Sequence, residues 1–419
     1  MHPNALVELS TELLHRVLQF DSPADRVVSD FFRQHRTLGM RERHTLAETT
    51  YTVLRQRLLY QHLAQSGRGE MERRLVLLGW QGNAAFLRAA LVDGEAQWLE
   101  KVESVDRAAL PERLRHNLPE WLAERLKTEV ADDFWPLVES LNSNAPLDLR
   151  VNTFKAKREQ VLAEFVAAGI EVTPTPYSPW GLRAQGKPAL HKLDVFMRGD
   201  VEVQDEGSQL LALLIDAKRG EMVVDFCAGA GGKTLALGAS MRNTGRLYAF
   251  DTSGHRLAAL KPRLARSGLS NVHPVQIAHE RDDRIKRLAG KIDRVLVDAP
   301  CSGLGTLRRN PDMKWRQSPE AVDELRVKQA AILNSAARLT KSGGRLVYAT
   351  CSLLRAENED IADAFCAEHS REFKRVPAEQ VLGEAHVEQA ASLVQGPNLR
   401  LWPHKHGTDG FFAAVWQRI

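Results

Sequence analysis

The strongest constraint on the fold is a regular alternation of short apolar runs and amphipathic helices in the C-terminal half of the chain. Strands that alternate with helices form a parallel sheet, because each crossover between parallel strands needs about a dozen residues. The expected strands are 222–226, 247–250, 272–277, 292–297 and 346–349, and the expected helices are 206–217, from Gly231 onward, 257–267 and 320–339. The sequence therefore predicts an α/β, Rossmann-like, doubly wound domain over 206–419 with a mostly parallel sheet.

Two of the predicted strands end on a cysteine that is followed by a serine. One leads into Asp298-Ala299-Pro300-Cys301-Ser302-Gly303, and the last leads into Cys351-Ser352. The carboxyl ends of parallel strands share one edge of a sheet, where such domains hold their ligands. A lone cysteine is more often a small buried apolar residue than a nucleophile, and we interpret Cys366 in that way. Cys301 and Cys351 are instead expected to meet at an active site.

A glycine-rich turn, Cys227-Ala228-Gly229-Ala230-Gly231-Gly232-Lys233, follows the first of these strands. Glycines let a ligand approach the backbone, and the helix start offers N–H groups to a carboxylate or phosphate. A Walker A loop needs glycine where Cys227 stands, and a G-x-G-x-x-G motif needs it at Thr234, so neither a nucleoside triphosphate nor NAD is favoured.

An acidic residue closes the next strand. Asp251 lies 251 − 225 = 26 residues after Asp225 and can accept hydrogen bonds from the two hydroxyls of a ribose. The glycine-rich turn alone is equally compatible with a tight connection, but the acidic strand end favours a nucleoside. S-adenosylmethionine, a nucleoside that carries an amino acid, fits this pattern.

A methyl donor beside a thiol suggests methylation of carbon 5 of a pyrimidine. Carbon 5 is a poor nucleophile, but a thiolate that adds to carbon 6 turns the ring into an enamine whose carbon 5 can take a methyl group. The reaction also needs an acidic group against N3 and the exocyclic amine. Asp298 is placed for that role, and the alternative is that it caps the turn after its strand. The residues alone do not show which thiol attacks the base.

The composition excludes other classes of protein. The chain has 419 residues, enough for two or three domains, and a formal net charge of +4, which permits a polyanionic partner. Its four cysteines form no C-x-x-C pair and have no histidine at zinc-ligand spacing, so we expect no disulfide framework and no metal. No apolar run approaches the roughly 18 residues of a membrane span, so we expect a soluble, cytoplasmic protein without a membrane partner.

The N-terminal third is predicted to be helical over residues 5–140. Ala47, Tyr51, Leu54 and Leu58 recur at helical spacing and predict one amphipathic helix. The arginines nearby are Arg33, Arg36, Arg41, Arg43, Arg55 and Arg57. They form either a solvated helix face or a patch that contacts phosphates, and both interpretations stay open.

The helical pattern of the sequence ends at Asn142-Ser143-Asn144-Ala145-Pro146, and a small α/β module follows. It is predicted over 145–205, with strands at 147–151 and 170–172, a helix at 158–168, a loop through Pro174, Pro176 and Pro179, and an end near Val201-Glu202-Val203-Gln204-Asp205. The chain is therefore predicted to have three parts, 1–140, 145–205 and 206–419.

Taken together, the motifs resemble those of the RNA (cytosine-5) methyltransferases of the Sun and nucleolar-protein family. The resemblance covers most of the chain and is greatest to the bacterial 16S ribosomal RNA enzymes with a NusB-like N-terminal domain. The motifs that carry it are Asp298 to Gly303, Arg308-Arg309-Asn310-Pro311-Asp312 with Lys314-Trp315, Ala349-Thr350-Cys351-Ser352, and Asp409-Gly410-Phe411-Phe412.

The resemblance implies a role for each site residue. Cys351 is implied to be the nucleophile, Cys301 to assist product release, and Asp298 to lie between cofactor and target base. The turn from Cys227 to Lys233 is implied to surround the methionine part of S-adenosylmethionine, and Asp251 to hold its ribose.

The resemblance also implies the parts and the partner. Residues 1–140 are similar to NusB-like RNA-binding domains, and 145–205 look like the RRM-like module that precedes the methyltransferase domain. The expected product is 5-methylcytosine in RNA, foremost 16S ribosomal RNA, made by a monomer.

The chain departs from the family pattern at two places. Gly229-Ala230 replace the usual Ala-Pro of the first turn, which keeps the backbone donors. The third strand normally ends in Gly-Asp, but here Gln276-Ile277-Ala278-His279-Glu280 stands, so either His279 or Glu280 substitutes or adenine is held less firmly.

Two rival functions stay open. One is methylation of cytosine in transfer RNA, because the catalytic motifs do not distinguish classes of RNA. The other is a non-catalytic RNA-binding or ribosome-assembly protein on a degenerate methyltransferase fold, which the missing aspartate keeps open.

Overall fold

The computed structural model describes all 419 residues, which divide into two compact units. The helical unit comprises Met1–Asn144 and Thr306–Pro319, and the α/β unit comprises Ala145–Gly305 and Glu320–Ile419. The predicted boundaries of three parts stay a prediction. No helix combines the length and the apolar character needed to cross a membrane.

The helical unit confirms the prediction of helix through the N-terminal third. Its helices are α1 (Pro3–Val17), α2 (Ala24–Gln34), α3 (Met40–Arg55), α4 (Arg57–Ala64), α5 (Met71–Gly79), α6 (Ala84–Arg88), α7 (Glu95–Glu103), α8 (Glu112–His116), α9 (Glu120–Val130), α10 (Phe134–Leu141) and α17 (Met313–Arg316). Apolar faces of α1, α3, α4 and α5 pack together, for example through Leu14, Val53 and Leu63.

The stripe predicted to form one helix is in fact divided between two. Gln56, with φ −109° and ψ 26°, interrupts the helical conformation between α3 and α4. Arg55 is buried and donates to the carbonyl oxygen of Arg308 at 2.9 Å. The guanidinium of Arg57 lies over the ring of Trp315, 5.2 Å from its centroid. For Arg55, both a solvated face and a phosphate-contacting patch are wrong, because its side chain is buried inside the helical unit, whereas Arg57 is half-buried against Trp315.

The segment Thr306–Pro319 explains part of this packing. Asp312 accepts a hydrogen bond at 3.1 Å from the backbone N–H of Ala24, the first residue of α2. Lys314 is buried and donates to the carbonyl oxygen of Arg55 at 2.9 Å. One of the motifs that carried the family resemblance therefore serves, in part, to hold the helical unit together.

The α/β unit begins with a small antiparallel sheet of strand order β2-β3-β1-β4. Its elements are β1 (Leu147–Val151), α11 (Arg158–Ala167), β2 (Val172–Pro174), β3 (Gly181–Ala184), α12 (Asp194–Met197) and β4 (Val201–Val203). Leu149, Phe165 and Leu182 belong to its core. Pro174, predicted to lie in a loop, ends β2. No strand was predicted between Pro179 and Val201, but Gly181–Ala184 forms β3 and pairs with β1. A four-residue strand is too short for its period-2 pattern to be recognised in the sequence.

A second, larger sheet has the strand order β11-β12-β13-β9-β8-β5-β6-β7, with β10 beside β13. Its strands are β5 (Met222–Asp225), β6 (Arg246–Asp251), β7 (Val272–Gln276), β8 (Ile292–Asp298), β9 (Thr340–Thr350), β10 (Phe373–Val376), β11 (Val394–Gln395), β12 (Asn398–Leu401) and β13 (Phe411–Arg418). Neighbours from β7 through β6, β5 and β8 to β9 are parallel, which confirms the predicted Rossmann-like sheet. The remaining strands pair antiparallel.

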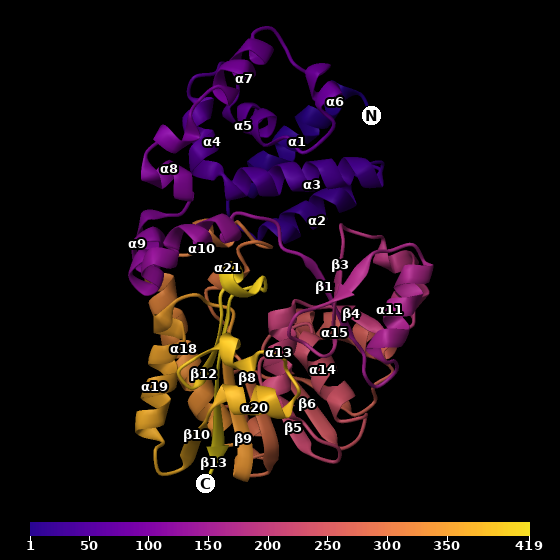
Figure 1. Cartoon of the computed structure of the whole chain (residues 1–419), viewed down its shortest axis with the longest axis vertical. Coiled ribbons are helices and arrows are strands. Elements are labelled where there is room, and N and C mark those ends of the chain that lie inside the picture. The colour runs from indigo at the N-terminus through magenta and orange to yellow at the C-terminus, as the bar shows by residue number, and fades with distance from the viewer. The chain divides into compact units, whose positions relative to one another are not determined.

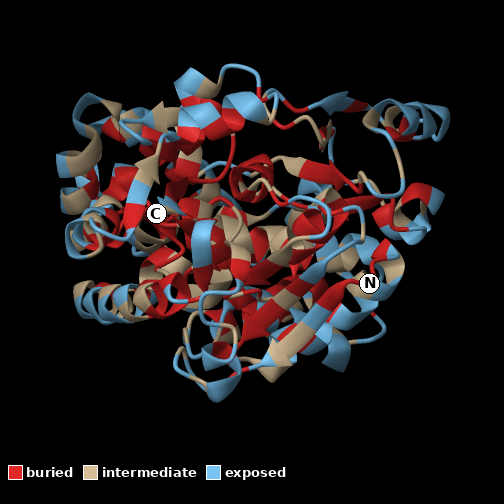
Figure 2. Cartoon of the chain, turned by 90° about the horizontal axis from the view of Figure 1, so that it is seen from below, coloured by how far each residue is buried: buried red, intermediate tan, exposed pale blue.

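Helices cover both faces of this sheet. They are α13 (Glu206–Ile215), α14 (Gly232–Ser240), α15 (Gly254–Ser267), α16 (Asp283–Lys286), α18 (Pro319–Ala337), α19 (Glu359–Glu368), α20 (Ala378–Glu384) and α21 (Pro403–His406). Figure 1 shows α18 and α19 on one side of the strands and α13, α14 and α15 on the other. Successive strand residues enter opposite cores: Leu296 packs toward α13, whereas Val295 and Val297 pack toward α18. Figure 2 shows the resulting buried interior with exposed residues on the outward helix faces.

Candidate functional site

The carboxyl ends of β8 and β9 bring the two predicted thiols together. These strands are parallel neighbours in which Asp298 lies opposite Ala349. The Sγ atoms of Cys301 and Cys351 are 3.4 Å apart. Two thiols at this distance share one proton readily, and both cannot ionise at once without strong repulsion.

The surroundings of Cys301 favour its protonated form. Its pKa is raised well above the ordinary value by its hydrogen bond to Cys351, then by burial, and then by the nearby charges of Cys351 and Glu357. Cys301 can therefore act as a proton donor toward the sulfur of Cys351.

The third predicted catalytic group, Asp298, is paired with Lys233. The Nζ atom of Lys233 lies 2.7 Å from Oδ2 of Asp298, and 29% of the Asp298 side chain is exposed. Because the carboxylate contacts this ammonium group, Asp298 does not serve as a cap on the turn after β8. Burial opposes the charge of Lys233, but Asp298 and a Cys351 thiolate outweigh it and raise the pKa of Lys233. The ammonium group therefore links Asp298 and Cys351 electrostatically.

The predicted cofactor turn is held in place by hydrogen bonds to the end of β6. The N–H of Gly229 donates to Oδ2 of Asp251 at 2.8 Å, and the N–H of Ala228 donates to the carbonyl oxygen of Phe250 at 2.8 Å. Gly229 and Gly231 have φ of 57° and 81°. A Cβ atom on Gly231 would lie 2.2 Å from Leu260, so only glycine fits there.

This turn fits the adenosyl and methionine groups of the predicted cofactor. Gly229 has open space where a side chain would stand. The free N–H groups at the start of α14 suit the carboxylate of an amino acid. Asp251 is buried and fixed, with Oδ1 accepting from the N–H of Ser253 at 2.7 Å, so it presents a rigid acceptor at the strand end.

Two further side chains lie at this turn: Asp225, which ends β5 and is buried, and Cys227, which is half-buried. Burial raises the pKa of Asp225 to about 7, against a smaller opposing effect of its hydrogen bond from Thr234. Burial, followed by nearby carboxylates, raises the pKa of Cys227 well above the ordinary value. Cys227 therefore stays a thiol without nucleophilic character, and its place beside the cofactor stays a prediction.

The end of β7 carries a carboxylate that the sequence analysis overlooked. Oδ2 of Asp282 accepts from the N–H of Ala278 at 3.0 Å, and Oδ1 accepts from the N–H of Arg284 at 2.9 Å. These backbone bonds, in that order, lower the pKa of Asp282. Asp282 thus stiffens the loop that contains His279 and Glu280, which remain the predicted substitutes for the family aspartate.

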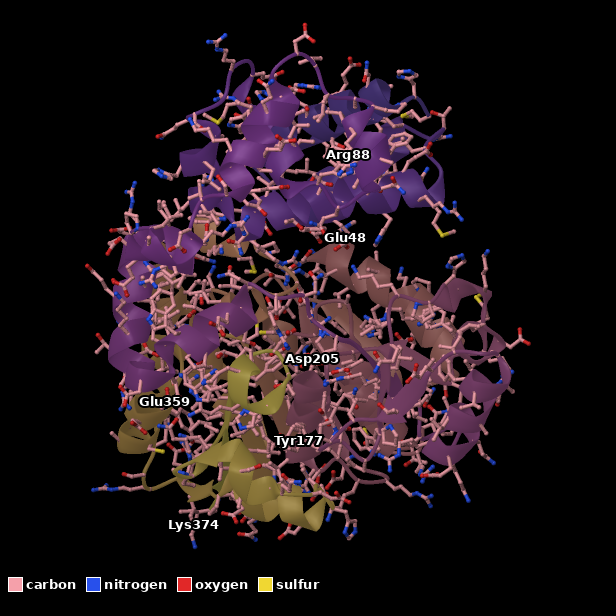
Figure 3. All side chains as sticks on the ribbon, turned by 45° about the horizontal axis from the view of Figure 1, so that its top comes forward. Glu48, Arg88, Tyr177, Asp205, Glu359 and Lys374 are labelled. Carbon is pink, nitrogen blue, oxygen red and sulfur yellow. The ribbon has the colours of Figure 1, made fainter.

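The C-terminal motif also lies at this edge. The N–H of Gly410 donates to the carbonyl oxygen of Gly305 at 2.8 Å, and a Cβ atom on Gly305 would lie 2.1 Å from the Gly410 oxygen. Asp205, labelled in Figure 3, accepts from the N–H of Asp409 at 3.1 Å. The motif therefore closes the loop that follows Cys301.

Arg150 is another residue that the sequence analysis missed. It belongs to β1 of the small antiparallel sheet, is 2% exposed, and donates to the carbonyl oxygen of Gly232 at 2.7 Å. The small sheet therefore supports the cofactor turn through a buried guanidinium group. No spacing in the sequence could have predicted it, because the contact spans 82 residues.

Two protein-family models match parts of this chain. Residues 212–417 match the model described as 16S rRNA methyltransferase RsmB/F, and residues 118–190 match the RsmF/B-like ferredoxin-like domain. The cofactor predicted from the sequence, S-adenosylmethionine, agrees with this match to a methyltransferase family.

Two relatives are each named "Probable ribosomal RNA small subunit methyltransferase B". The protein of Synechocystis sp. is 36% identical over 72% of this chain and 66% of its own length, slightly less than two thirds. The protein of Bacillus subtilis is 32% identical over 80% of this chain and 74% of its own length. Among solved structures, PH0851 has a TM-score of 0.79 with 28% identity and covers 100% of this chain and 99% of its own.

Proposed function

The chain belongs to the RsmB/F family of 16S rRNA methyltransferases, and from this premise we propose that it methylates carbon 5 of a cytosine in 16S ribosomal RNA. The observation that carries the proposal is the pair of thiols, 3.4 Å apart, beside the ion pair of Lys233 and Asp298. Methyl transfer to an oxygen or nitrogen atom needs no thiol, whereas methyl transfer to carbon 5 needs one thiolate to add and a second group to assist its departure.

In the proposed reaction Cys351 is the nucleophile. Its sulfur forms a bond to carbon 6, and the electrons of the carbon 5–carbon 6 double bond become available at carbon 5. Lys233 stabilises the Cys351 thiolate before attack. Asp298 lies against N3 and the exocyclic amine and orients the base, while Lys233 fixes the direction of its carboxylate.

S-adenosylmethionine, when bound, would supply the methyl group as an electrophile and leave as the neutral thioether S-adenosylhomocysteine. Asp251 would hold the ribose hydroxyls, and the turn from Cys227 to Lys233 would hold the methionine part. After carbon 5 has taken the methyl group and lost its proton to a base, the carbon–sulfur bond breaks and the electron pair returns to Cys351. The Cys301 thiol donates a hydrogen bond to the departing sulfur, which supports its role in product release.

We further propose that the helical N-terminal region, residues 1–140, is an RNA-binding domain of NusB-like type. The small module at 145–205 and the methyltransferase domain at 206–419 complete the enzyme, which we expect to act as a monomer. A ribosomal RNA substrate supports a cytoplasmic location.

The decisive experiment incubates the purified chain with methyl-labelled S-adenosylmethionine and either unmodified 16S ribosomal RNA or a transfer RNA transcript. Bisulfite sequencing then locates any 5-methylcytosine. A single modified cytosine in 16S RNA supports the proposal. Methyl label found only in transfer RNA would show that transfer RNA is the substrate. No measurable binding of S-adenosylmethionine by calorimetry would favour the non-catalytic RNA-binding alternative.

A further inference from the structure

A single buried carboxylate contacts both Cys-Ser pairs. The side chain of Glu357 is 0% exposed. Its Oε1 accepts from the N–H of Ser302 at 2.8 Å, and its Oε2 accepts from the hydroxyl of Ser302 at 2.5 Å and from the hydroxyl of Ser352. Because Ser302 follows Cys301 and Ser352 follows Cys351, this carboxylate ties the two cysteine-bearing loops to one point.

Neighbouring side chains extend the same connection. Gln329, on α18, donates to Oε1 of Glu357 at 3.0 Å and to the carbonyl oxygen of Pro300 at 3.0 Å. Asn358 accepts from the hydroxyl of Thr350 at 2.5 Å and donates to the carbonyl oxygen of Ser352 at 3.0 Å. Ser302, Thr350 and Ser352 are thus bonded directly to the segment that contains Glu357, and Pro300 is connected to it through Gln329.

The hydrogen-bond partners of Glu357 are all neutral. Burial of a carboxylate without a cation is costly unless several hydrogen bonds satisfy it. Glu359, labelled in Figure 3 and only two positions later, is instead paired with Nε of Arg400 at 3.4 Å. A neutral amide or hydroxyl could satisfy Ser302 and Ser352 without this cost, so the charge at Glu357 calls for a functional explanation.

We propose that Glu357 is a positioning residue that fixes the two Cys-Ser pairs at reacting distance and keeps the proton on Cys301. It acts through Ser302 and Ser352, and the inference rests on the proposed function of the two thiols. The direction of its electrostatic effect agrees, because the charge of Glu357 is among the causes that raise the pKa of Cys301, after Cys351 and burial.

The test compares the wild-type chain with Glu357→Gln, which preserves shape and removes the charge. The rate of alkylation of Cys301 by iodoacetamide, followed by mass spectrometry across pH, reports the pKa of that thiol without RNA or cofactor. We expect the midpoint for Cys301 to move to lower pH. We also expect kcat for methyl transfer to fall by about tenfold or more, because the amide can keep the hydrogen bonds but removes the charge that helps to keep the proton on Cys301, with KM for RNA and the affinity for S-adenosylmethionine nearly unchanged.

The matched control is Glu206→Gln. Glu206 is equally buried in the same unit and accepts from the N–H groups of Tyr177 and Ser178, at 2.6 and 2.7 Å, without contact to either cysteine. This variant should leave the Cys301 midpoint where it is in the wild type. A loss of methyl transfer in Glu357→Gln with an unchanged Cys301 midpoint would overturn the inference, because it would indicate a merely structural role.

If Glu357→Gln does not yield folded protein, Ser302→Ala provides the second variant. It removes one of the two hydroxyl donors and leaves the charge in place, so kcat should fall while the Cys301 midpoint stays high. Wild-type kcat in this variant would count against the inference. If the wild-type chain itself transfers no methyl group to RNA, the proposed function fails, whereas the alkylation midpoints still decide the role of Glu357.

Discussion

The Sγ atoms of Cys301 and Cys351 lie 3.4 Å apart although 50 residues separate them in the chain. This contact predicts different outcomes for the two alanine variants. Cys351→Ala removes the proposed nucleophile and should lower methyl transfer by about a thousandfold or more. Cys301→Ala should still form the bond to carbon 6 but release the product slowly. It should therefore accumulate a protein–RNA adduct that survives denaturing electrophoresis.

Cys366→Ala is the control for both variants, because Cys366 accepts hydrogen bonds from Arg375 and Trp416 on another part of the sheet. Normal methyl transfer by Cys351→Ala would show that Cys351 is not the nucleophile. A protein–RNA adduct formed by that variant would show that Cys301 attacks the base and that the two roles are exchanged.

The ion pair between Lys233 and Asp298, with Nζ and Oδ2 2.7 Å apart, predicts a strong effect of Lys233→Met. The variant leaves Asp298 without its partner and the Cys351 thiolate without a nearby cation. A charge-assisted hydrogen bond in a partly buried site contributes strongly to stabilisation of the transition state, so kcat/KM should fall by about tenfold to a thousandfold. Lys218→Met, which removes an exposed lysine in the same unit, should be neutral in the same methyl-transfer assay. Equal activity of the two variants would exclude Lys233 from the reaction.

The buried carboxyl group of Asp225 predicts a pH dependence of stability. Burial raises its pKa from 3.8 in the unfolded chain to about 7 in the folded one. Between these two pKa values the folded state holds a proton that the unfolded chain has lost. The resulting stabilisation of the folded state is complete below the unfolded pKa and is lost as the pH rises through the folded pKa. Asp225→Asn cannot titrate but can still accept from Thr234. The wild-type melting temperature should therefore fall more steeply with rising pH between about pH 4 and 7 than that of the variant. Parallel curves would show that Asp225 does not titrate in this range.

The capping contact of Asp312 predicts a stability effect within the helical unit. Oδ2 of Asp312 accepts from the N–H of Ala24 at 3.1 Å, so Asp312→Ala leaves the start of α2 without an acceptor. The loss of a helix cap costs about 1 kcal/mol, which denaturant unfolding followed by circular dichroism can measure. Asp323→Ala, an exposed aspartate on α18, is the comparison and should change the free energy of unfolding much less. If both variants unfold alike, the contact to Ala24 contributes nothing.

Much of the fold could be predicted from the sequence, because long elements repeat their pattern several times. The strands β5 to β8 and the helices α13, α15 and α18 were predicted within a few residues, and the parallel pairing followed from their alternation. The strand β9 begins at Thr340 rather than at residue 346, and α16 was not predicted. Short elements escaped prediction: β3 has four residues, and Gln56 interrupts an apolar stripe that continues across it. Where a helix is interrupted although its apolar pattern continues, tertiary packing decides the position of the interruption. The apolar pattern carries no information about that packing.

The sequence by itself determined the chemistry that this protein can offer: two Cys-Ser pairs at strand ends, an aspartate before one of them, and a glycine-rich turn. These are local facts, since each motif is contiguous and its strand ends where the apolar run ends. Only the tertiary structure decided which groups meet. Register between β8 and β9 places Cys301 against Cys351, the fold of the turn directs Lys233 to Asp298, and a buried carboxylate at Glu357 contacts both serines. Such contacts span tens of residues and depend on burial and strand order, which no local pattern records.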